Sequence, residues 1–423
     1  MNIKVRKSKS QGVVVLPASK SDMHRAIFAA CLAKNESIIE NITLSEDVNA
    51  TIDIFRKLGA IIAQKDDRLF IKGINDFDSI LSKDLNCNES GSTLRFIIPL
   101  LGLFDFEFNI SGKPYLFKRP LSVYEEIYKN QDLKFELNDN LLKIKGKLKE
   151  GKYIIPGNIS SQFISGLLFM LPLLKGDSKI KILPPFESKS YVKMTIKTLE
   201  AFNIKIYQES ELEYYIPGNQ EYKACNYKVE SDYSQFVFYA VLGAINNDIT
   251  CRGLNFNSIQ GDKEILEILD EFKVKYSVNN DSITIHKPKN LLGKSIDLSN
   301  CPDLGPAIMI LSAFNSKPVR IINIKRLRLK ESDRVEAMVT NLRKMNVKID
   351  VFDNNMIIYP SNIKASKSIL SSFNDHRIVM SMVLIASMIK GISVIDNPGC
   401  IKKSYVNYFK DMQSLGIDIG ICN

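Results

Sequence analysis

Apolar and polar positions follow one another along this chain in a pattern that predicts alternating strands and helices. Residues 13–16 form a short β-rich run, and residues 21–33 place apolar side chains three or four positions apart, as on one face of a helix. A second helix is expected over residues 51–58, because Gly59 follows it and glycine commonly ends helices. Short alternating runs then predict a hairpin: residues 61–63 and 69–71, on either side of Asp66 and Asp67.

The same succession returns at a nearly constant interval, for example as a helix over 264–272 and strands over 274–278 and 283–285. Each interval opens with a polar cluster before an apolar helical run, and successive clusters lie 70 to 72 residues apart. They are centred on Lys20, Gly91, Ser161, Asp232, Asp303 and Asp375. A fixed period indicates one supersecondary unit used repeatedly. We therefore expect an α/β fold of six βαβαββ-like repeats of ~70 residues, three in each of two domains, with a boundary near Glu230.

Composition limits the class of protein. The 423 residues, 45% of them hydrophobic and 25% charged, are enough for two buried cores. The net charge of +10 indicates either acidic partners, such as nucleic acid or small anions, or only a solvated basic surface. Seven cysteines without C-x-x-C spacing indicate reduced, intracellular thiols. The longest apolar run, 163–174, is too short to span a membrane and no signal peptide is recognisable, so we expect a cytoplasmic protein without a membrane partner.

Cations stand where several predicted helices begin: Lys20 and Arg25, Lys330 and Arg334, and His376 with Arg377. A cation at that end opposes the helix dipole and costs roughly a few tenths of a kcal/mol. Residues that repeatedly go against such local preferences are expected at functional sites, and bound anions would offset this cost. The alternative for any single residue is a surface cation on a frayed turn.

Hydroxyl and amide groups open the apolar run at Ser160, Ser161 and Gln162. These side chains are either ordinary helix caps or, beside a bound phosphate, hydrogen-bond donors.

Two carboxylates occupy comparable positions. Asp303 precedes an apolar helix, where it is either a cap or, among several cations, an ionised group able to accept a proton from a substrate hydroxyl. Glu331 lies three residues before Arg334, so we expect both on one side of the helix start, either as a salt bridge or as an acid beside an anion-binding arginine.

Several familiar signatures are missing from the sequence. It contains no G-x-x-x-x-G-K-[ST], G-x-G-x-x-G or G-x-S-x-G motif. His24, His286 and His376 lie far apart without ligand spacing, which argues against a metal site. The absence of tryptophan and of an aromatic–basic motif argues against nucleic acid as a partner. The sequence favours an enzyme that handles small anions with Arg and Lys residues and acid–base carboxylates.

Read in order, the clusters form a series of motifs that spans essentially the whole chain: LPASKSDMHRA, SGSTLR, KRP, GNISSQF, ESKSY, PD, RLRLKESDR, NDHR and IKKSY. This series resembles that of the 5-enolpyruvylshikimate-3-phosphate (EPSP) synthase family, whose opening motif is L-P-G-S-K-S-x-x-x-R-A. The combination of RxKESDR with NDHR is highly specific for that family.

The resemblance implies a two-domain inside-out α/β barrel, with 1–17 plus 231–423 in one domain, 18–230 in the other and the active site in the cleft between them. The implied reaction transfers the enolpyruvyl (1-carboxyvinyl) group of phosphoenolpyruvate to the 5-hydroxyl of shikimate 3-phosphate and releases phosphate. It belongs to the shikimate pathway to chorismate and the aromatic amino acids. The implied partners are these two anionic substrates, with no cofactor and no metal, and we expect a monomer.

Carried over by position, the resemblance implies that shikimate 3-phosphate is bound by Lys20, Ser21, Arg25, Ser160, Ser161, Gln162, Ser188, Asp303 and Lys330. Phosphoenolpyruvate would be bound by Lys20, Gly91, Arg119, Gln162, Arg334, Arg377 and Lys403. Asp303 would remove the proton of the 5-hydroxyl. Glu331, together with Lys20, would handle the proton at the methylene carbon, and the tetrahedral intermediate would then lose phosphate.

The chain departs from the family pattern at a few positions. Ala18 replaces a common Gly, His24 stands where Asn is frequent, and Glu89 occupies the position before a small residue of the second motif. Arg326 stands where some members have an Asn that contacts the shikimate ring. Gly91 keeps the small residue beside the phosphoenolpyruvate site, so the resemblance implies sensitivity to glyphosate.

Two alternatives differ in what they require. The related UDP-N-acetylglucosamine enolpyruvyl transferase uses a loop cysteine as an acid, whereas here Cys87 precedes the second cluster and residues 111–120 contain no cysteine. A non-catalytic polyanion-binding protein would need only the cations, and Asp303 and Glu331 would be dispensable.

Overall fold

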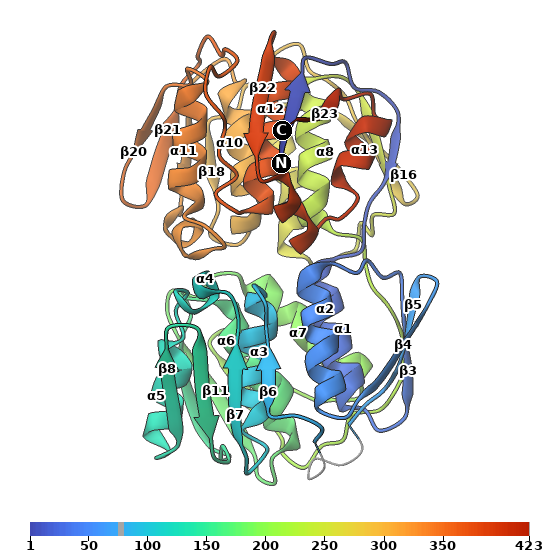
Figure 1. Cartoon of the computed structure of the whole chain (residues 1–423), viewed down its shortest axis with the longest axis vertical. Coiled ribbons are helices and arrows are strands. Elements are labelled where there is room, and N and C mark those ends of the chain that lie inside the picture. The colour runs from blue at the N-terminus through green and yellow to red at the C-terminus, as the bar shows by residue number, and fades with distance from the viewer. Residues whose placement is uncertain (75–79, 423) are drawn as a thin grey trace. The chain divides into compact units, whose positions relative to one another are not determined.

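The computed structural model describes residues 1–74 and 80–422 and has a mixed α/β fold (Figure 1). Its contacts divide the chain into two compact units: unit 1 is Met1–Pro17 with Ser231–Asn423, and unit 2 is Ala18–Glu230. Each unit has its own cluster of buried apolar side chains. Unit 2 is thus inserted into unit 1 after Pro17, and the mixed α/β class expected from the sequence is confirmed.

Unit 2 contains three four-stranded sheets in the described residues, ordered β14-β3-β5-β4, β6-β7-β9-β8 and β10-β11-β13-β12. In each sheet the first pair is parallel and the other two are antiparallel. Its elements are α1 (Lys20–Leu32), β3 (Glu36–Glu40), α2 (Glu46–Lys57), β4 (Ile61–Lys65), β5 (Arg68–Lys72), β6 (Asp84–Asn86), α3 (Gly91–Leu101), β7 (Glu107–Ser111), α4 (Pro114–Phe117), α5 (Ser122–Asn130), β8 (Lys134–Asn138), β9 (Leu141–Lys145), β10 (Lys152–Pro156), α6 (Ser161–Met170), η1 (Leu171–Leu173), β11 (Ser178–Leu183), α7 (Lys189–Ala201), β12 (Tyr207–Ser210), β13 (Glu213–Ile216) and β14 (Asn226–Lys228).

Unit 1 repeats this pairing order in β2-β15-β17-β16 and β18-β19-β21-β20. A third sheet has the order β22-β1-β23, and Leu370 adds a parallel bridge to Ile395 of β22. The elements are β1 (Asn2–Arg6), β2 (Val13–Val15), α8 (Tyr233–Ile245), β15 (Ile249–Arg252), η2 (Gly261–Glu264), α9 (Ile265–Glu271), β16 (Tyr276–Asn279), β17 (Ser282–Ile285), β18 (Ser295–Asp297), η3 (Pro302–Leu304), α10 (Gly305–Ala313), β19 (Val319–Ile322), η4 (Lys325–Leu329), α11 (Arg334–Lys344), β20 (Ile349–Val351), β21 (Asn355–Ile358), α12 (His376–Met388), β22 (Ile392–Asp396), η5 (Pro398–Lys403), α13 (Tyr408–Ser414) and β23 (Ile419–Cys422).

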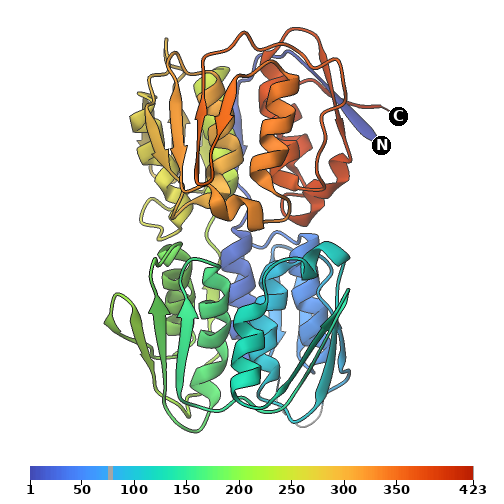
Figure 2. The same cartoon turned by 90° about the vertical axis from the view of Figure 1, so that its left-hand side faces the viewer.

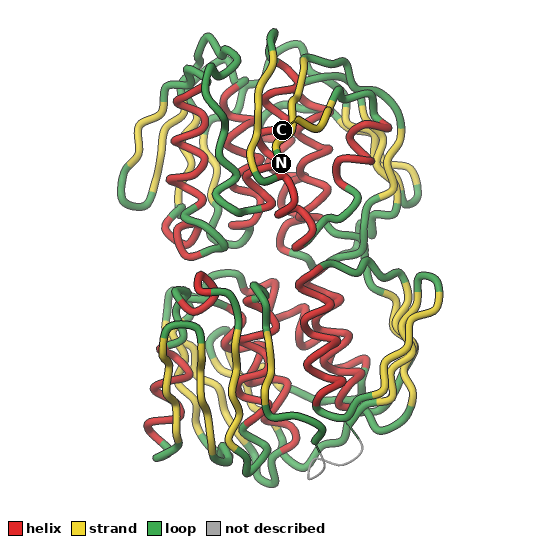
Figure 3. The backbone as a smooth tube through the Cα atoms, in the orientation of Figure 1, coloured by secondary structure: helices red, strands yellow, loops and turns green. Residues whose placement is uncertain are grey.

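The helices that follow the polar clusters form the centre of each unit. Every residue of α8 and α10 is buried, which is expected of helices that are apolar all round. In unit 2, Phe28 of α1, Phe96 of α3 and Phe169 of α6 pack against one another in edge-to-face and tilted arrangements, with ring centroids 5.3–5.4 Å apart. Strands lie on either side of these helices (Figures 2 and 3). Because the helices share one core, their first turns are held in fixed positions within each unit.

The element boundaries differ from the sequence prediction where polar residues or proline hide a helix end. The helix expected over 51–58 starts earlier, because the Ser45 hydroxyl caps α2 and Glu46 opens it. The run over 163–174 is not one helix: α6 ends at Met170 and the chain continues as a 3-10 turn through Pro172, which lacks an N–H. The hairpin at residues 61–71 is confirmed.

The described residues contain no helix both long and apolar enough to cross a membrane. All seven cysteines are free, as expected.

Candidate active site

In unit 1, charged side chains from separate segments converge on Asp303, which lies in η3 at the start of α10. The Nζ of Lys330 is 3.0 Å and the Nη1 of Arg334 is 2.9 Å from the same carboxylate oxygen, Oδ1. Burial alone would raise the pKa of Asp303, but Lys330, Arg377 and Arg334 outweigh it and hold the pKa well below its usual range. Asp303 is therefore an ionised carboxylate at neutral pH.

Arg334 is the centre of this network. Its side chain is 1% exposed and also contacts Glu331 (Nη2 to Oε2, 2.6 Å) and Asp375 (Nε to Oδ2, 2.8 Å). The hydroxyl of Ser332 donates to the same Asp375 oxygen at 3.0 Å. Burial opposes the charge of Arg334, but the three carboxylates raise its pKa, and Arg334 together with His376 lowers the pKa of Asp375 against its own burial. A buried arginine that is hydrogen-bonded to three carboxylates holds those side chains in fixed positions.

Arg377 and Lys403 complete the cluster at the start of α12. Arg377 donates from Nη1 to the carbonyl of Ser234 (2.9 Å), from Nη2 to its hydroxyl (2.7 Å), and from Nη1 to the carbonyl of Asp303 (3.2 Å). Its Nη2 is 3.6 Å from the second carboxylate oxygen of Asp303, Oδ2. Lys403 donates to the carbonyl of Asn374 at 2.6 Å. These contacts join Asp303, Lys330, Glu331, Arg334 and Arg377 in one network, and Lys403 lies beside it on the carbonyl of Asn374.

One local expectation for this cluster is wrong, and one of the two alternatives given for Asp303 is excluded. Lys330 and Glu331 lie before α11 and not in its first turn, because Asp333 is the cap and accepts a hydrogen bond from Glu336 at 2.9 Å. Asp303 does not cap α10, which has no side-chain cap among its described neighbours. The cations here are also not on frayed turns: carboxylates inside the protein already balance the charge of Arg334.

In unit 2, Lys20 and Arg25 of α1 are both held by neighbouring elements. The Nζ of Lys20 is 2.9 Å from Asp47 of α2, with side chains only 17% and 9% exposed. Arg25 is buried and donates to the hydroxyl of Thr195 (2.8 Å) and to the carbonyls of Ser21 (2.6 Å) and Tyr191 (3.0 Å). Burial lowers the pKa of Arg25 to about 10, so it is still protonated at neutral pH. These hydrogen bonds fix the position of the Arg25 guanidinium within unit 2.

Gly91, the first residue of α3, lies against the guanidinium of Arg119. A Cβ atom on Gly91 would be 2.2 Å from Nη1 and 2.7 Å from Cζ of that arginine. The Nε of Arg119 is buried and has no hydrogen-bond partner among the described residues. The absent side chain of Gly91 therefore sets where this guanidinium lies.

Gln162 joins the starts of α3 and α6. Its amide donates to the hydroxyl of Ser92 at 2.9 Å, and its carbonyl accepts from Arg95 at 2.8 Å. The Ser160 hydroxyl oxygen accepts from the backbone N–H of Gln162, so Ser160 is a helix cap as expected, with its own proton still available to donate. Ser188 precedes α7 with φ +53°, a left-handed conformation that is uncommon for serine.

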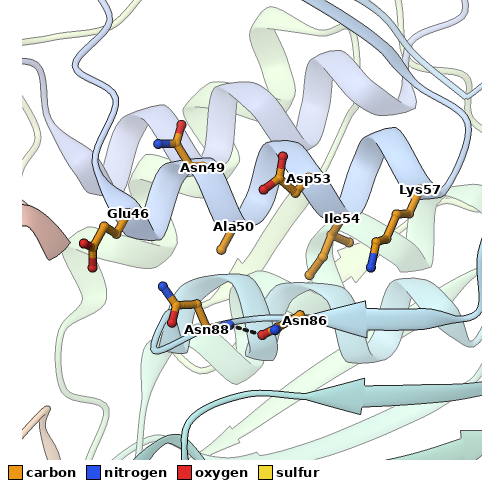
Figure 4. Close-up of a pocket in the computed structure, with 8 residues that line it drawn as sticks. All are labelled: Glu46, Asn49, Ala50, Asp53, Ile54, Lys57, Asn86 and Asn88. Atoms are coloured by element: carbon orange, nitrogen blue, oxygen red, sulfur yellow. Dashed lines mark hydrogen bonds between the residues drawn. The ribbon is translucent and has the colours of Figure 1, made fainter.

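A pocket of about 620 Å³ in unit 2 lies beside this region and contains none of the predicted residues (Figure 4). Glu46, Asn49 and Asp53 line it from one face of α2, and Asn86 and Asn88 face them from the end of β6. Glu46 is the neighbour of Asp47, the partner of Lys20.

Sequence reasoning missed Asp47, Arg95, Ser234 and Asp375 as site residues. The last three lie inside the recurring polar clusters, so the repeat itself was a signal for them. Asp47 lies outside any cluster and is recognisable only from the packing of α2 against α1.

The family model and the relatives that match this chain carry the same name. The family model of EPSP synthase (3-phosphoshikimate 1-carboxyvinyltransferase) matches residues 5–412. A 3-phosphoshikimate 1-carboxyvinyltransferase of Clostridium perfringens is 43% identical over 415 residues, 97% of each chain. That of Clostridioides difficile is 39% identical and covers 98% of this chain and 97% of its own.

Solved structures share the fold. EPSP synthase from Acinetobacter baumannii has a TM-score of 0.82 at 22% identity, with all of both chains covered. The enolpyruvyl transferase NikO from Streptomyces tendae has a TM-score of 0.83 at 16% identity, over 99% of this chain and 98% of its own.

Proposed function

The chain belongs to the EPSP synthase family, and we propose that it performs the family's reaction with the two clusters of charged residues described above. The enzyme transfers the enolpyruvyl group of phosphoenolpyruvate to the 5-hydroxyl of shikimate 3-phosphate and releases phosphate, in the shikimate pathway. The names of its relatives favour this acceptor over UDP-N-acetylglucosamine, and favour catalysis over polyanion binding.

The fold proposed for this function is an inside-out α/β barrel of six βαβαββ repeats, three in each unit. The pairing order parallel, antiparallel, antiparallel supports six copies of one unit. The first and fourth repeats exchange their first strands, since β2 pairs with β15 and β14 with β3. In the sixth, the chain's own first strand, β1, lies between β22 and β23.

In our proposal, shikimate 3-phosphate is bound mainly by unit 2, through Lys20, Ser21, Arg25, Ser160, Ser161, Gln162 and Ser188, with Asp303 and Lys330 from unit 1. Two features support this assignment. Helix starts offer unpaired backbone N–H groups to a phosphate. Beside them, Arg25 supplies a buried positive charge and Ser160 a hydroxyl proton.

Phosphoenolpyruvate is assigned to Lys20, Gly91, Arg119, Gln162, Arg334, Arg377 and Lys403. It carries a phosphate and a carboxylate, and guanidinium groups match both in a two-point geometry. Arg119 supports this assignment, because its buried Nε lacks a partner and its guanidinium lies against a residue without a side chain. Such an arginine is available to an incoming anion.

Asp303 acts as the base in this proposal. Its Oδ1 accepts from both Lys330 and Arg334, whereas among the described residues Oδ2 has only the 3.6 Å contact with Arg377 and can accept the proton of the 5-hydroxyl. The low pKa of the resting carboxylate makes it a weak base. Substrate anions that neutralise Lys330 and Arg377 raise that pKa and strengthen it.

The remaining steps follow from the same groups. The deprotonated 5-oxygen bonds to C2 of phosphoenolpyruvate while Glu331, with Lys20, delivers a proton to the methylene carbon, C3. In the resulting tetrahedral intermediate the bond from C2 to the phosphate oxygen breaks, and one proton leaves C3 to restore the double bond. The cations around the site stabilise the phosphate as it departs.

The convergence of Lys330 and Arg334 on one oxygen of Asp303 is the observation that carries this proposal. The test is phosphate release from phosphoenolpyruvate by the purified protein, with shikimate 3-phosphate and UDP-N-acetylglucosamine offered separately. We expect release with the first acceptor only. Release with the nucleotide sugar alone would contradict the acceptor, and no release with either would contradict catalysis. A cytoplasmic location and a monomeric state stay predictions.

A further inference from the structure

We propose that a lysine-lined pocket in unit 1, which shares no residue with the cluster around Arg334, binds a small oligophosphate anion. The pocket has a volume of about 400 Å³, within the range of small-molecule sites. Its polar lining consists of Lys273, Lys275, His286, Lys287, Lys289 and Asn290, which lie next to β16 and β17 in the chain.

The four lysines come from two segments that are hydrogen-bonded to each other. Lys273 and Lys275 lie between α9 and β16, and Lys287 and Lys289 follow β17. The backbone N–H of His286 donates to the carbonyl of Lys275 at 2.9 Å, which ties the segments together. The lysines of each pair are two residues apart in the chain, and all four line the same pocket.

Asp248 holds the wall of the pocket through both of its carboxylate oxygens. One of its carboxylate oxygens contacts Nδ1 of His286 at 2.9 Å, and the other accepts from the backbone N–H of Lys287 at 2.9 Å. The hydroxyl of Ser277 contacts the other imidazole nitrogen at 2.8 Å. Both Asp248 oxygens therefore contact the backbone and the imidazole, and neither contacts a lysine ammonium.

Some lysines on other sheets of this protein are paired with acids. Lys134 lies 3.0 Å from Glu107 beside β8, and Lys179 lies 2.8 Å from Glu209 beside β12. In the described part of the chain, by contrast, none of the four pocket lysines makes an ion pair or a side-chain hydrogen bond, and no acid lines the pocket.

Like charges gathered in one hollow repel each other, and a ligand with several negative charges removes that repulsion at several ammonium groups at once. A monovalent carboxylate cannot span two segments, and the volume excludes a large ligand. The chemistry that fits is a chain of two or three phosphate groups, either free or attached to a nucleoside.

The test is calorimetric titration with inorganic tripolyphosphate, and in parallel with ATP, at 0.15 M salt. The variant K287Q/K289Q removes two pocket charges. The variant K364Q/K367Q removes two exposed lysines of the same unit that lie outside the pocket. K20Q alters the proposed catalytic phosphate site in unit 2. Melting curves without ligand check that each variant is folded.

We expect K287Q/K289Q to weaken binding about tenfold, while K364Q/K367Q and K20Q bind like the unmodified protein. Tighter binding of ATP would identify the ligand as a nucleotide, and equal binding would identify the phosphate chain alone. Equal weakening by K364Q/K367Q, or loss with K20Q but not with K287Q/K289Q, overturns the proposal. So does binding of a single-stranded oligonucleotide in the absence of any binding of tripolyphosphate. Because turnover is not measured, the outcome is independent of the proposed function.

Discussion

Replacing Gly91 by alanine tests the position of Arg119 more directly than removing the arginine. The added Cβ would lie 2.2 Å from Nη1, 2.7 Å from Cζ and 3.0 Å from Nη2 of Arg119. Carbon and nitrogen atoms that are not bonded rest near 3.5 Å, so the guanidinium must move by roughly 1 Å. The backbone at Gly91 is helical, so alanine itself is well tolerated there.

A displacement of this size is large for catalysis and small for folding. A catalytic or binding group misplaced by 1 Å can cost about 100-fold in rate, so we expect kcat/KM for phosphoenolpyruvate to fall about 10- to 100-fold, or roughly 1.4–2.8 kcal/mol. The clash involves the far end of a flexible side chain, and we therefore expect the free energy of unfolding to change by less than about 1 kcal/mol.

The assay is phosphate release with phosphoenolpyruvate varied at saturating shikimate 3-phosphate, and then the reverse. The loss should appear with phosphoenolpyruvate and leave KM for shikimate 3-phosphate nearly unchanged. G420A is the matched control, because a Cβ at Gly420 has no neighbour within 4 Å. A kcat/KM for phosphoenolpyruvate within twofold of the unmodified enzyme in G91A would refute the role of Arg119, and a large drop in melting temperature would show that the clash acts through folding.

Three further predictions follow from the same contacts. D303N should lower kcat more than about 100-fold while both substrates still bind, as judged by single-turnover and equilibrium binding experiments, and unimpaired turnover would contradict its role as base. D375N should lower the free energy of unfolding at pH 7 by about 3–5 kcal/mol, because it leaves Arg334 without its fully buried partner. The pKa of Asp375 is lowered in the folded state, so its contribution to stability is complete above the ordinary pKa of 3.8 and is lost as the pH falls below that value. The difference in free energy of unfolding between D375N and the parent, measured in urea, should therefore shrink at acid pH and not at alkaline pH. Glyphosate should inhibit the enzyme in competition with phosphoenolpyruvate, and full turnover at inhibitor levels well above the KM for phosphoenolpyruvate would contradict that expectation.

Much of the architecture is predictable from the sequence because the repeat carries two signals at once. The polar clusters mark where helices begin, and the apolar runs after them are buried all round in α8 and α10. The pattern of apolar and polar residues cannot predict that two repeats exchange their first strands. The pairing of β2 with β15 and of β14 with β3 depends on contacts between residues far apart in the chain, which leave no trace in local periodicity.

The candidate site shows the same division between local and distant information. Arg334 was identifiable because a cation at a helix start breaks a local rule, and Asp303 and Glu331 were identifiable as carboxylates near such cations. The balance of the Arg334 charge by three carboxylates could not be identified from the sequence, because Asp375 comes from a separate repeat. Asp47 is the clearest case: it is an ordinary first-turn acid of α2, and only the approach of α2 to α1 makes it the partner of Lys20.

The position of β1 between β22 and β23 has a consequence for how the protein is made. A ribosome that adds about 5–20 residues per second needs roughly 20–80 s after β1 emerges before β23 follows it. Unit 2 has all its strands by then, because β14 at its end pairs with β3 near its beginning. Unit 2 can therefore fold while β23 is still to be made, whereas unit 1 completes its last sheet only after β23 has emerged from the ribosome.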